Sequence, residues 1–319
     1  MSLPKRARCA VIALGGNAIS PPNQTDSITS QFRHTRESLS GIIKFVRRGY
    51  NLAITHGNGP QVGAAMRRVE LSRGVEPYVP LGVLVADTQG SMGYMIEQSL
   101  INRLNRERLP RQVVTIITQV LVDQNDPALA NPSKFIGQIY TKETAEAFIR
   151  DEGWTMKPYN GDDKWRRVVG SPKPLHIVNC EAIRELVQSG VVIIAAGGGG
   201  IPVYDDPVLG LEGVDAVIDK DRAAAVLAND IIAEELIILT NTDAVYTDYG
   251  KPTRKRLASL SIDRAKELLE AGEFPEGSMG PKIEAAVQFI ERGGERAIIC
   301  ALDQAEEALA GRAGTEIIE

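Results

Sequence analysis

The chain has 319 residues, which is long enough for one large α/β domain or two smaller ones. Hydrophobic residues make up 43% of it and charged residues 24%, proportions that are ordinary for a globular protein. The formal net charge is −5 and the basic residues form no long run, so nucleic acid is not an expected partner. A small anion held by a few well-placed cations fits this charge balance better.

The three cysteines, Cys9, Cys180 and Cys300, lie far apart in the sequence and are odd in number. This pattern favours a reduced, cytoplasmic compartment over a disulfide framework. No apolar stretch reaches the roughly 20 residues that span a bilayer, and the N-terminal residues do not have the pattern of a signal peptide. We therefore expect a cytoplasmic protein without a membrane partner.

Apolar runs typical of strands alternate with helical patterns along most of the chain, which predicts a mainly parallel sheet with helices on both faces. The expected strands are residues 9–14, 51–56, 112–120, 191–196, 235–240 and 296–301, with a short strand at the C-terminus. The expected helices include one that carries Leu39 and Ile42 on one side, one that begins at Pro60, and others at 87–106, 180–189, 220–229, 261–271 and 281–292.

The segment from about 123 to 176 departs from this alternation. It contains five prolines, both tryptophans and many charges. The stretch KETAEAFIRDEG is typical of a short helix, and the rest is typical of hairpins and loops. Because long structureless loops are uncommon in compact domains, we predict an inserted subdomain that acts as a lid.

Three of the apolar runs end in glycine-rich turns. The turns are Gly15-Gly16-Asn17, Gly57-Asn58-Gly59 and Gly197-Gly198-Gly199-Gly200. A buried parallel strand that ends in glycine lets backbone N–H groups approach an anion closely, usually beside a helix N-terminus. Three such turns predict a site for a ligand with many phosphate oxygens.

Several common motifs are missing from the chain. There is no GxxxxGK[ST] motif, and GNGPQVG has one residue too many for the dinucleotide pattern GxGxxG. There is no GxSxG motif, and the only histidines are His34, His56 and His176. These absences argue against a P-loop enzyme, a dinucleotide enzyme, a serine hydrolase and a metal site.

Two lysines stand at the starts of predicted helices. Lys220 follows Asp219, and Lys282 follows Pro281. A cation there opposes the helix dipole unless the helix and the lysine share an anion. Phosphoryl transfer needs such neutralised charge and careful positioning, which glycine amides, lysines and Mg²⁺ can supply. Asp219 is either a plain helix N-cap or a group that orients the lysines or lies near the metal.

The segment 239–252, LTNTDAVYTDYGKP, follows a predicted strand. Thr240, Asn241 and Asp243 offer polar groups, and Tyr246 offers a flat aromatic face. These residues could seat an adenine and a ribose, although turns after strands often have the same composition.

Taken together, these blocks resemble the carbamate kinases of the amino acid kinase family. The matching stretches cover nearly the whole chain in order: VIALGGNAIS, THGNGPQVG, QGSMGYMIEQ, DPALANPSKFIG, AAGGGGIPV, EGVDAVIDKD, LTNTDAVYTDYGKP and FPEGSMGPKIEAAVQFI. The resemblance implies a three-layer α/β/α sandwich on a mainly parallel open sheet, a small protruding subdomain and a homodimer.

The resemblance also implies roles for individual residues. Many amino acid kinases have a lysine two residues before the first glycine pair, where this chain has Ala13. In carbamate kinases the protruding subdomain is thought to supply the missing cation, and Lys134 in NPSKFIG matches it. Lys134, Lys220 and Lys282 would stabilise the moving phosphoryl group, and Asp219 would organise them.

The ligands implied are carbamate or carbamoyl phosphate, and ADP or ATP with Mg²⁺. The first would lie near Gly15, Gly16, Asn17 and Gly57 to Gly59. The nucleotide would lie near Lys220, the 240s segment, Ser278 and Met279, and the turn from Gly197 to Gly200 would face both. One domain of this family would then span 1–319, with a carbamate-binding half (1–122 and 176–215), the lid (123–175) and a nucleotide-binding half (216–319).

Three alternatives compete with this assignment. A kinase for another carboxylate, such as N-acetylglutamate, is disfavoured by Ala13 and by the NPSKFIG block. A non-catalytic nucleotide-binding protein would not need the full set of Lys134, Lys220, Lys282 and Asp219. A dinucleotide dehydrogenase lacks both the glycine spacing and the acid expected downstream of it.

Overall fold

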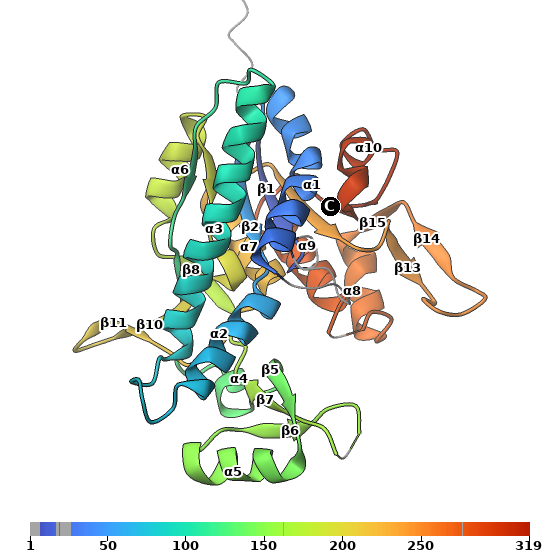
Figure 1. Cartoon of the computed structure of the whole chain (residues 1–319). Helices are drawn as coiled ribbons and strands as arrows, with labels where there is room; N and C mark the ends of the chain where they lie inside the picture. The colour runs from blue at the N-terminus through green and yellow to red at the C-terminus, as the bar shows by residue number, and fades with distance from the viewer. Residues whose placement is uncertain (1–6, 17–18, 20–26, 162, 276) are drawn as a thin grey trace, which may run out of the picture.

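The computed structural model describes residues 7–16, 19, 27–161, 163–275 and 277–319. Its centre is an eight-stranded sheet in the order β15-β17-β16-β12-β1-β2-β9-β3 (Figure 1). All neighbouring strands in this sheet are parallel except β16 and β17. The strands are β1 (Cys9–Leu14), β2 (Asn51–His56), β3 (Val113–Thr115), β9 (Val192–Ile194), β12 (Glu235–Thr240), β15 (Ser259–Ser261), β16 (Arg296–Ala301) and β17 (Thr315–Ile318).

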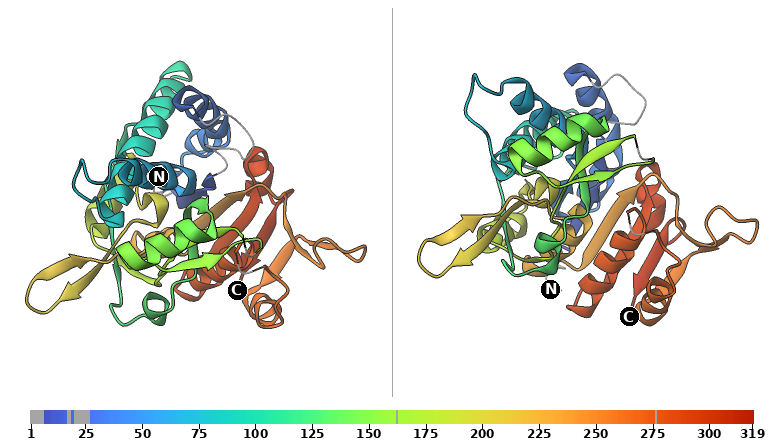
Figure 2. Two further views of the ribbon diagram at one scale, coloured as in Figure 1. Left: turned by 60° about the horizontal axis from the view of Figure 1, so that its bottom comes forward. Right: turned by 90° about the horizontal axis from the view of Figure 1, so that it is seen from below.

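Helices cover both faces of this sheet, which confirms the predicted three-layer α/β/α sandwich (Figures 1 and 2). One face carries α1 (Ile28–Arg47), α3 (Leu81–Arg106) and α10 (Ala305–Leu309). The other face carries α6 (Cys180–Gln188), α7 (Lys220–Asp230), α8 (Ile262–Glu270) and α9 (Gly280–Glu291). Within the described part of the chain, no helix combines the length and the apolar composition needed to cross a bilayer.

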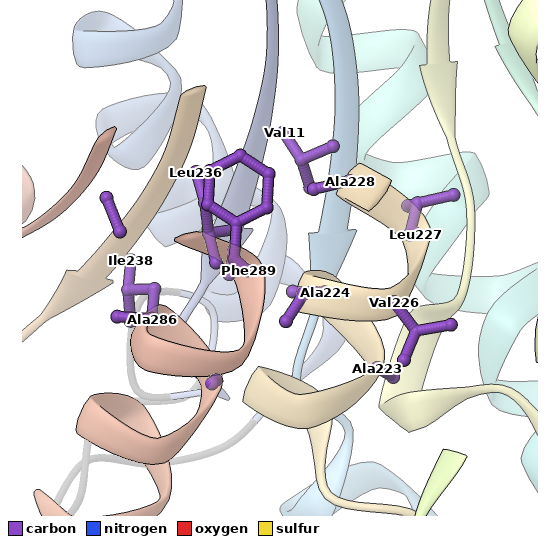
Figure 3. Close-up of a cluster of buried hydrophobic side chains, with 14 of the residues drawn as sticks. Val11, Ala223, Ala224, Val226, Leu227, Ala228, Leu236, Ile238, Ala286 and Phe289 are labelled. Carbon is purple, nitrogen blue, oxygen red and sulfur yellow. The ribbon is translucent and has the colours of Figure 1, made fainter. Parts of the chain in front are cut away.

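The strand β1 shows why both faces need cover. Its side chains are all buried, with Val11 and Ala13 in one hydrophobic cluster and Ile12 and Leu14 in the other, as the two-residue period of a strand requires. Figure 3 shows the first of these clusters, where α7 and α9 face β1 and β12. The buried face of α7 is rich in alanine, which lets the helix lie close to the sheet, and Phe289 of α9 fills the space beside it.

A smaller sheet of four strands lies beside the central one, in the order β11-β10-β4-β8. Two hairpins, β10–β11 and β13–β14, project from opposite sides of the molecule in Figure 1, and the sequence patterns did not predict them. The bounds are β4 (Gln119–Val122), β8 (Pro174–Ile177), β10 (Ile201–Asp206), β11 (Gly210–Gly213), β13 (Val245–Thr247) and β14 (Lys255–Leu257).

The segment predicted as an inserted lid forms a small unit at the bottom of Figure 1, which we call the protruding subdomain. It has a three-stranded sheet in the order β5-β7-β6 and the predicted short helix α5. Its bounds are α4 (Pro127–Ala130), β5 (Lys134–Tyr140), α5 (Lys142–Glu152), β6 (Met156–Pro158) and β7 (Trp165–Val169). These elements fall within the predicted range 123–175, whereas β8 belongs to the four-stranded sheet.

Polar contacts join the protruding subdomain to the main body. The Tyr140 hydroxyl donates to the carboxylate of Glu70 at 2.6 Å, and Glu70 belongs to α2 (Gly59–Leu71). Arg167 of β7 donates to Asp215 at 2.9 Å and lies 4.3 Å from the Trp154 ring centroid. These contacts hold the start of β5, and therefore Lys134, against the main body.

Two expected elements have different bounds. The helix expected at 87–106 begins at Leu81, because burial of Leu81 and Val85 outweighs the weak helix propensity of the stretch that contains them. The strand expected at 112–120 is two strands, β3 and β4, in different sheets. The chain leaves the central sheet at Thr118, whose backbone N–H and C=O both pair with the side chain of Gln89.

Candidate active site

The carboxyl ends of four parallel strands meet at one edge of the central sheet. These strands are β1, β2, β9 and β12, and each of the three glycine turns follows one of the first three. The chain adds β2 and β9 on one side of β1 and β12 on the other, so the strand order reverses at β1. Open α/β sheets bind ligands in the crevice at such a point.

The first two glycine turns are in close contact. A Cβ atom on Gly57 would lie 2.9 Å from the backbone N of Gly16 and 3.5 Å from Cδ of Lys220, so glycine is required there. Gly15 is similarly close to the carbonyl of Leu239, at the end of β12. The third residue of the first turn, Asn17, lies outside the described residues.

The third turn packs onto the second. A Cβ atom on Gly197 would lie 2.3 Å from Nε2 of His56, and one on Gly198 would lie 2.2 Å from Nδ2 of Asn58. Asn58 is buried and donates to the hydroxyl of Thr88 at 2.9 Å. Gly59 then begins α2, whose N-terminus is a favourable position for an anion. The described residues of the three predicted turns therefore form one continuous wall, which we call the glycine wall.

The predicted lysines and two carboxylates gather beside this wall, and we call Lys134, Lys220, Lys282, Asp219 and Asp221 the lysine cluster. Lys134 Nζ lies 2.9 Å from Asp219 Oδ2, although the two residues are 85 positions apart. Lys220 pairs with one oxygen of Asp221, and Lys282 Nζ lies 2.9 Å from the other. Three cations face two carboxylates, so the cluster favours an added anion.

Asp219 is both the N-cap of α7 and the partner of a lysine. One oxygen, Oδ1, accepts from the backbone N–H groups of Asp221 and Arg222 at 2.9 and 3.3 Å and so caps α7. The other oxygen holds Lys134. Burial opposes ionisation of Asp219, but the charge and hydrogen bond of Lys134, with Lys220, lower its pKa to about 2.

A pocket of about 430 Å³ opens next to the lysine cluster. Of the six residues predicted for the nucleotide, five line it: Thr240, Asn241, Tyr246, Ser278 and Met279. The carboxylate of the sixth, Asp243, accepts from the Tyr246 hydroxyl at 2.9 Å and so orients the ring instead. Lys282 also lines the pocket, and it therefore joins the pocket to the lysine cluster.

Comparison with known proteins places this geometry in a family. The model of the amino acid kinase family matches residues 8–301. The chain belongs to the amino acid kinase family. It is 45% identical to the carbamate kinase of Thermococcus kodakarensis over 97% of this chain and 98% of that one, and 42% identical to that of Clostridium perfringens over 97% and 99%. A solved structure of the carbamate kinase of Giardia lamblia bound to AMP-PNP has 38% identity to this chain and a TM-score of 0.92, with 98% of each chain covered.

Sequence reasoning missed several residues of this amino acid kinase site. Asp221 holds both Lys220 and Lys282, and its side chain is only 5% exposed. Burial opposes its ionisation, but the two lysine charges lower its pKa overall. The alternation Asp219-Lys220-Asp221 was the available signal, since an acid on each side of a lysine can hold two cations. Tyr249, Phe274 and Pro275 also line the nucleotide pocket; they lie in two of the stretches that carry the family resemblance, but they were not assigned to the nucleotide individually.

His56 is a buried histidine in the wall of this amino acid kinase site. Its Nδ1 lies 3.3 Å from the carbonyl of Gly57, and its Nε2 has no hydrogen-bond partner among the described residues. Burial, with a smaller contribution from the charge of Lys220, lowers the pKa of His56 to about 4 against the opposing effect of the Gly57 carbonyl. The imidazole is therefore neutral in the folded protein at neutral pH.

This lowered pKa predicts acid sensitivity in a defined window. Between pH 6.5 and about 4 the unfolded chain takes up a proton at His56 that the folded protein refuses, so stability falls as the pH falls. The full effect is about 3 kcal/mol. We expect urea unfolding at pH 7.5 and pH 4.5 to show a smaller loss of stability in His56→Gln than in the parent. His34→Gln changes a histidine outside this site and should lose as much stability as the parent. An equal loss of stability in His56→Gln would show that His56 does not cause the acid sensitivity.

Proposed function

We propose that this protein is a carbamate kinase, which transfers a phosphoryl group reversibly between ATP and carbamate. Near-full-length identity to proteins named carbamate kinases carries the proposal. The site geometry supports it, because the lysine cluster lies between the glycine wall and the nucleotide pocket. The proposal includes a position for each substrate and a role for each residue of the site.

The transfer requires little covalent work from the protein. A carbamate oxygen attacks the γ-phosphorus of ATP, the bond from that phosphorus to the bridging oxygen breaks, and ADP leaves with the charge. In the reverse direction an ADP oxygen takes the phosphoryl group from carbamoyl phosphate. The chain has to hold both anions in line and neutralise charge during the transfer. Lys134, Lys220 and Lys282 are the side chains that we propose for this neutralisation.

The two substrates would approach the lysine cluster from opposite sides. Gly15, Gly16 and the turn from Gly57 to Gly59 would hold carbamate or carbamoyl phosphate, with Gly197 to Gly199 facing both substrates. The nucleotide would occupy the pocket that Tyr246 and Met279 line. This arrangement corresponds to a carbamate half (1–122 and 176–215), a nucleotide half (216–319) and the protruding subdomain as the lid (123–175).

Magnesium would accompany the nucleotide. Both carboxylates of the lysine cluster are engaged by lysines, and no group of three metal-binding side chains occurs at this site among the described residues. This donor set fits an ion held mainly by phosphate oxygens and water, with Asp219 and Asp221 nearby. When bound, Mg²⁺ would neutralise phosphate charge, while Lys134, Lys220 and Lys282 position the transferred group.

A homodimer and a cytoplasmic location complete the proposal. Tyr94 and Ile101 of α3, and Ile117 beside them, expose 58%, 36% and 44% of their surface. These side chains lie next to β3, the edge strand of the central sheet, and a second copy would cover them. Light scattering should give twice the 34.6 kDa of one chain, and a monomer mass at micromolar concentration would contradict the dimer.

The state of the cysteines supports the proposed cytoplasmic location. All three are free, as a reducing compartment requires.

The activity test is ATP formation from ADP, Mg²⁺ and fresh carbamoyl phosphate. We expect ATP above the blank, and a loss of roughly 10²- to 10³-fold in Lys282→Ala, because one charge-neutralising donor is removed. Lys266→Ala is the matched control, since Lys266 pairs with Glu291 on the outer face of the same half. A folded protein that binds ADP and forms no ATP would reject carbamate kinase activity.

A further inference from the structure

Three side chains with metal-binding atoms meet at the C-terminal end of α7, whereas the lysine cluster lies at its N-terminal end. They are His176 in β8, Cys180 at the first position of α6, and Asp230 at the last position of α7, and their ligand atoms lie within 4.8 Å of one another. In Figure 1, α6 and β8 lie on the left of the molecule and α7 lies nearer its centre. Because α7 has 11 residues, its two ends are about 16 Å apart, so this group is separate from the phosphoryl-transfer site.

The contacts within this group set the state of the imidazole. Asp230 Oδ2 lies 3.1 Å from Nδ1 of His176 and accepts from the backbone N–H of Ile177 at 2.7 Å. A carboxylate can only accept, so Nδ1 carries a proton, and in the neutral imidazole Nε2 keeps its lone pair. Nε2 lies 3.6 Å from Sγ of Cys180. The free lone pair of the histidine and the thiol therefore face each other.

That separation matches the edge of a tetrahedral zinc site. With Zn–S of about 2.3 Å and Zn–N of about 2.0 to 2.1 Å, the two ligand atoms of a tetrahedron are about 3.6 Å apart. We propose that Sγ of Cys180 and Nε2 of His176 bind one Zn²⁺, with Asp230 as the outer carboxylate that orients the imidazole. This carboxylate–histidine–metal arrangement is common in zinc proteins. Binding releases the thiol proton to solvent, and the thiolate becomes the ligand.

The group of three side chains reaches the surface at His176. The side chain of His176 is 49% exposed, whereas that of Asp230 is 18% exposed. Water or an added small ligand would complete the tetrahedron there, so the site is an open one and not a closed structural cage. A thiolate and an imidazole select zinc over Mg²⁺ and Ca²⁺, which prefer oxygen ligands.

A reactive cysteine is the alternative use of the same three residues. Burial and the neighbouring charge of Asp230 raise the pKa of the Cys180 thiol, which disfavours a free thiolate nucleophile. A bound dication is instead favoured by that negative charge. The C-terminal end of α7, where Asp230 lies, favours a cation, whereas the N-terminal end of α6, where Cys180 lies, favours the thiolate form that binds metal.

The test is a titration of the nucleotide-free protein with Co²⁺, a spectroscopic substitute for Zn²⁺, in the presence of excess Mg²⁺. We expect a thiolate-to-cobalt absorption band in the near ultraviolet that Zn²⁺ abolishes. Cys180→Ser should remove the band, and Asp230→Asn should weaken metal affinity by roughly 10- to 100-fold while the band remains. Zn²⁺ should also raise the melting temperature of the parent more than that of Cys180→Ser.

Matched variants separate this site from other metal binding. Cys9→Ser and His34→Asn change residues outside the group and should leave the band unchanged. A band that persists in Cys180→Ser, or no band in the parent at millimolar Co²⁺, would overturn the proposal. Alkylation of Cys180 without any metal response would indicate the reactive cysteine instead.

Discussion

Replacing Lys134 with alanine is expected to lower kcat for ATP formation by roughly 10²- to 10³-fold while nucleotide affinity stays nearly unchanged. Lys134 is the lysine-cluster cation that the protruding subdomain delivers, and it does not line the nucleotide pocket. Its amine meets Asp219 across 85 positions of sequence. A cation used mainly during the transfer lowers kcat when it is lost, whereas one used for binding raises KM or Kd.

The measurement combines steady-state kinetics with ADP binding by calorimetry. Lys142→Ala is the matched control, because Lys142 is an exposed lysine at the start of α5 in the same subdomain. It should retain the parent's kcat. Equal losses of turnover and ADP affinity in Lys134→Ala would instead indicate that the subdomain no longer docks on the main body.

The second large effect is expected for Gly199→Ala. Gly199 has a φ of +95°, and a Cβ atom there would lie 2.4 Å from the backbone oxygen of Ile218. Ile218 immediately precedes Asp219, so the backbone that must move is the one that starts α7 and positions Lys220. We expect a loss of about 3 kcal/mol in stability, from strained backbone and collision together.

The activity of Gly199→Ala should fall as well as its stability, even at temperatures where the variant is folded. A displacement of about 1 Å at a catalytic group lowers turnover by roughly 10²-fold. Differential scanning calorimetry and the ATP assay measure the two effects. Gly213→Ala is the control, because a Cβ at Gly213 meets nothing within 4 Å and its φ is not positive. Parent-like stability in Gly199→Ala would show that the turn tolerates a side chain.

Much of the fold could be predicted because its signals are local. The strands β1, β2 and β12 are continuous apolar runs, and buried parallel strands require such runs. Lys220 and Lys282 could be singled out because a lysine at a helix start is unfavourable without an anion. The glycine turns could be placed at one edge because parallel strands share their carboxyl ends.

What escaped prediction depends on contacts between distant segments. The break between β3 and β4 arises from Gln89, which lies on another element and takes both backbone groups of Thr118. The pairing of Lys282 with Asp221 joins residues 61 positions apart. The group of His176, Cys180 and Asp230 was likewise hidden, since the scarcity of histidines argued against a metal site and Asp230 is 50 or more positions from its neighbours.

In the proposed mechanism, the carboxylates of Asp219 and Asp221 also take the place of phosphate before substrate binds. Without substrate they hold three lysine amines that would otherwise repel one another, so the site can stay assembled while empty. An incoming phosphoryl group must compete with these built-in anions for the same amines. A weakly charged ligand such as chloride or acetate has little to gain from that exchange, whereas a phosphate carrying two charges and several oxygens can contact all three amines at once. We therefore expect the lysine cluster to discriminate against small, singly charged anions.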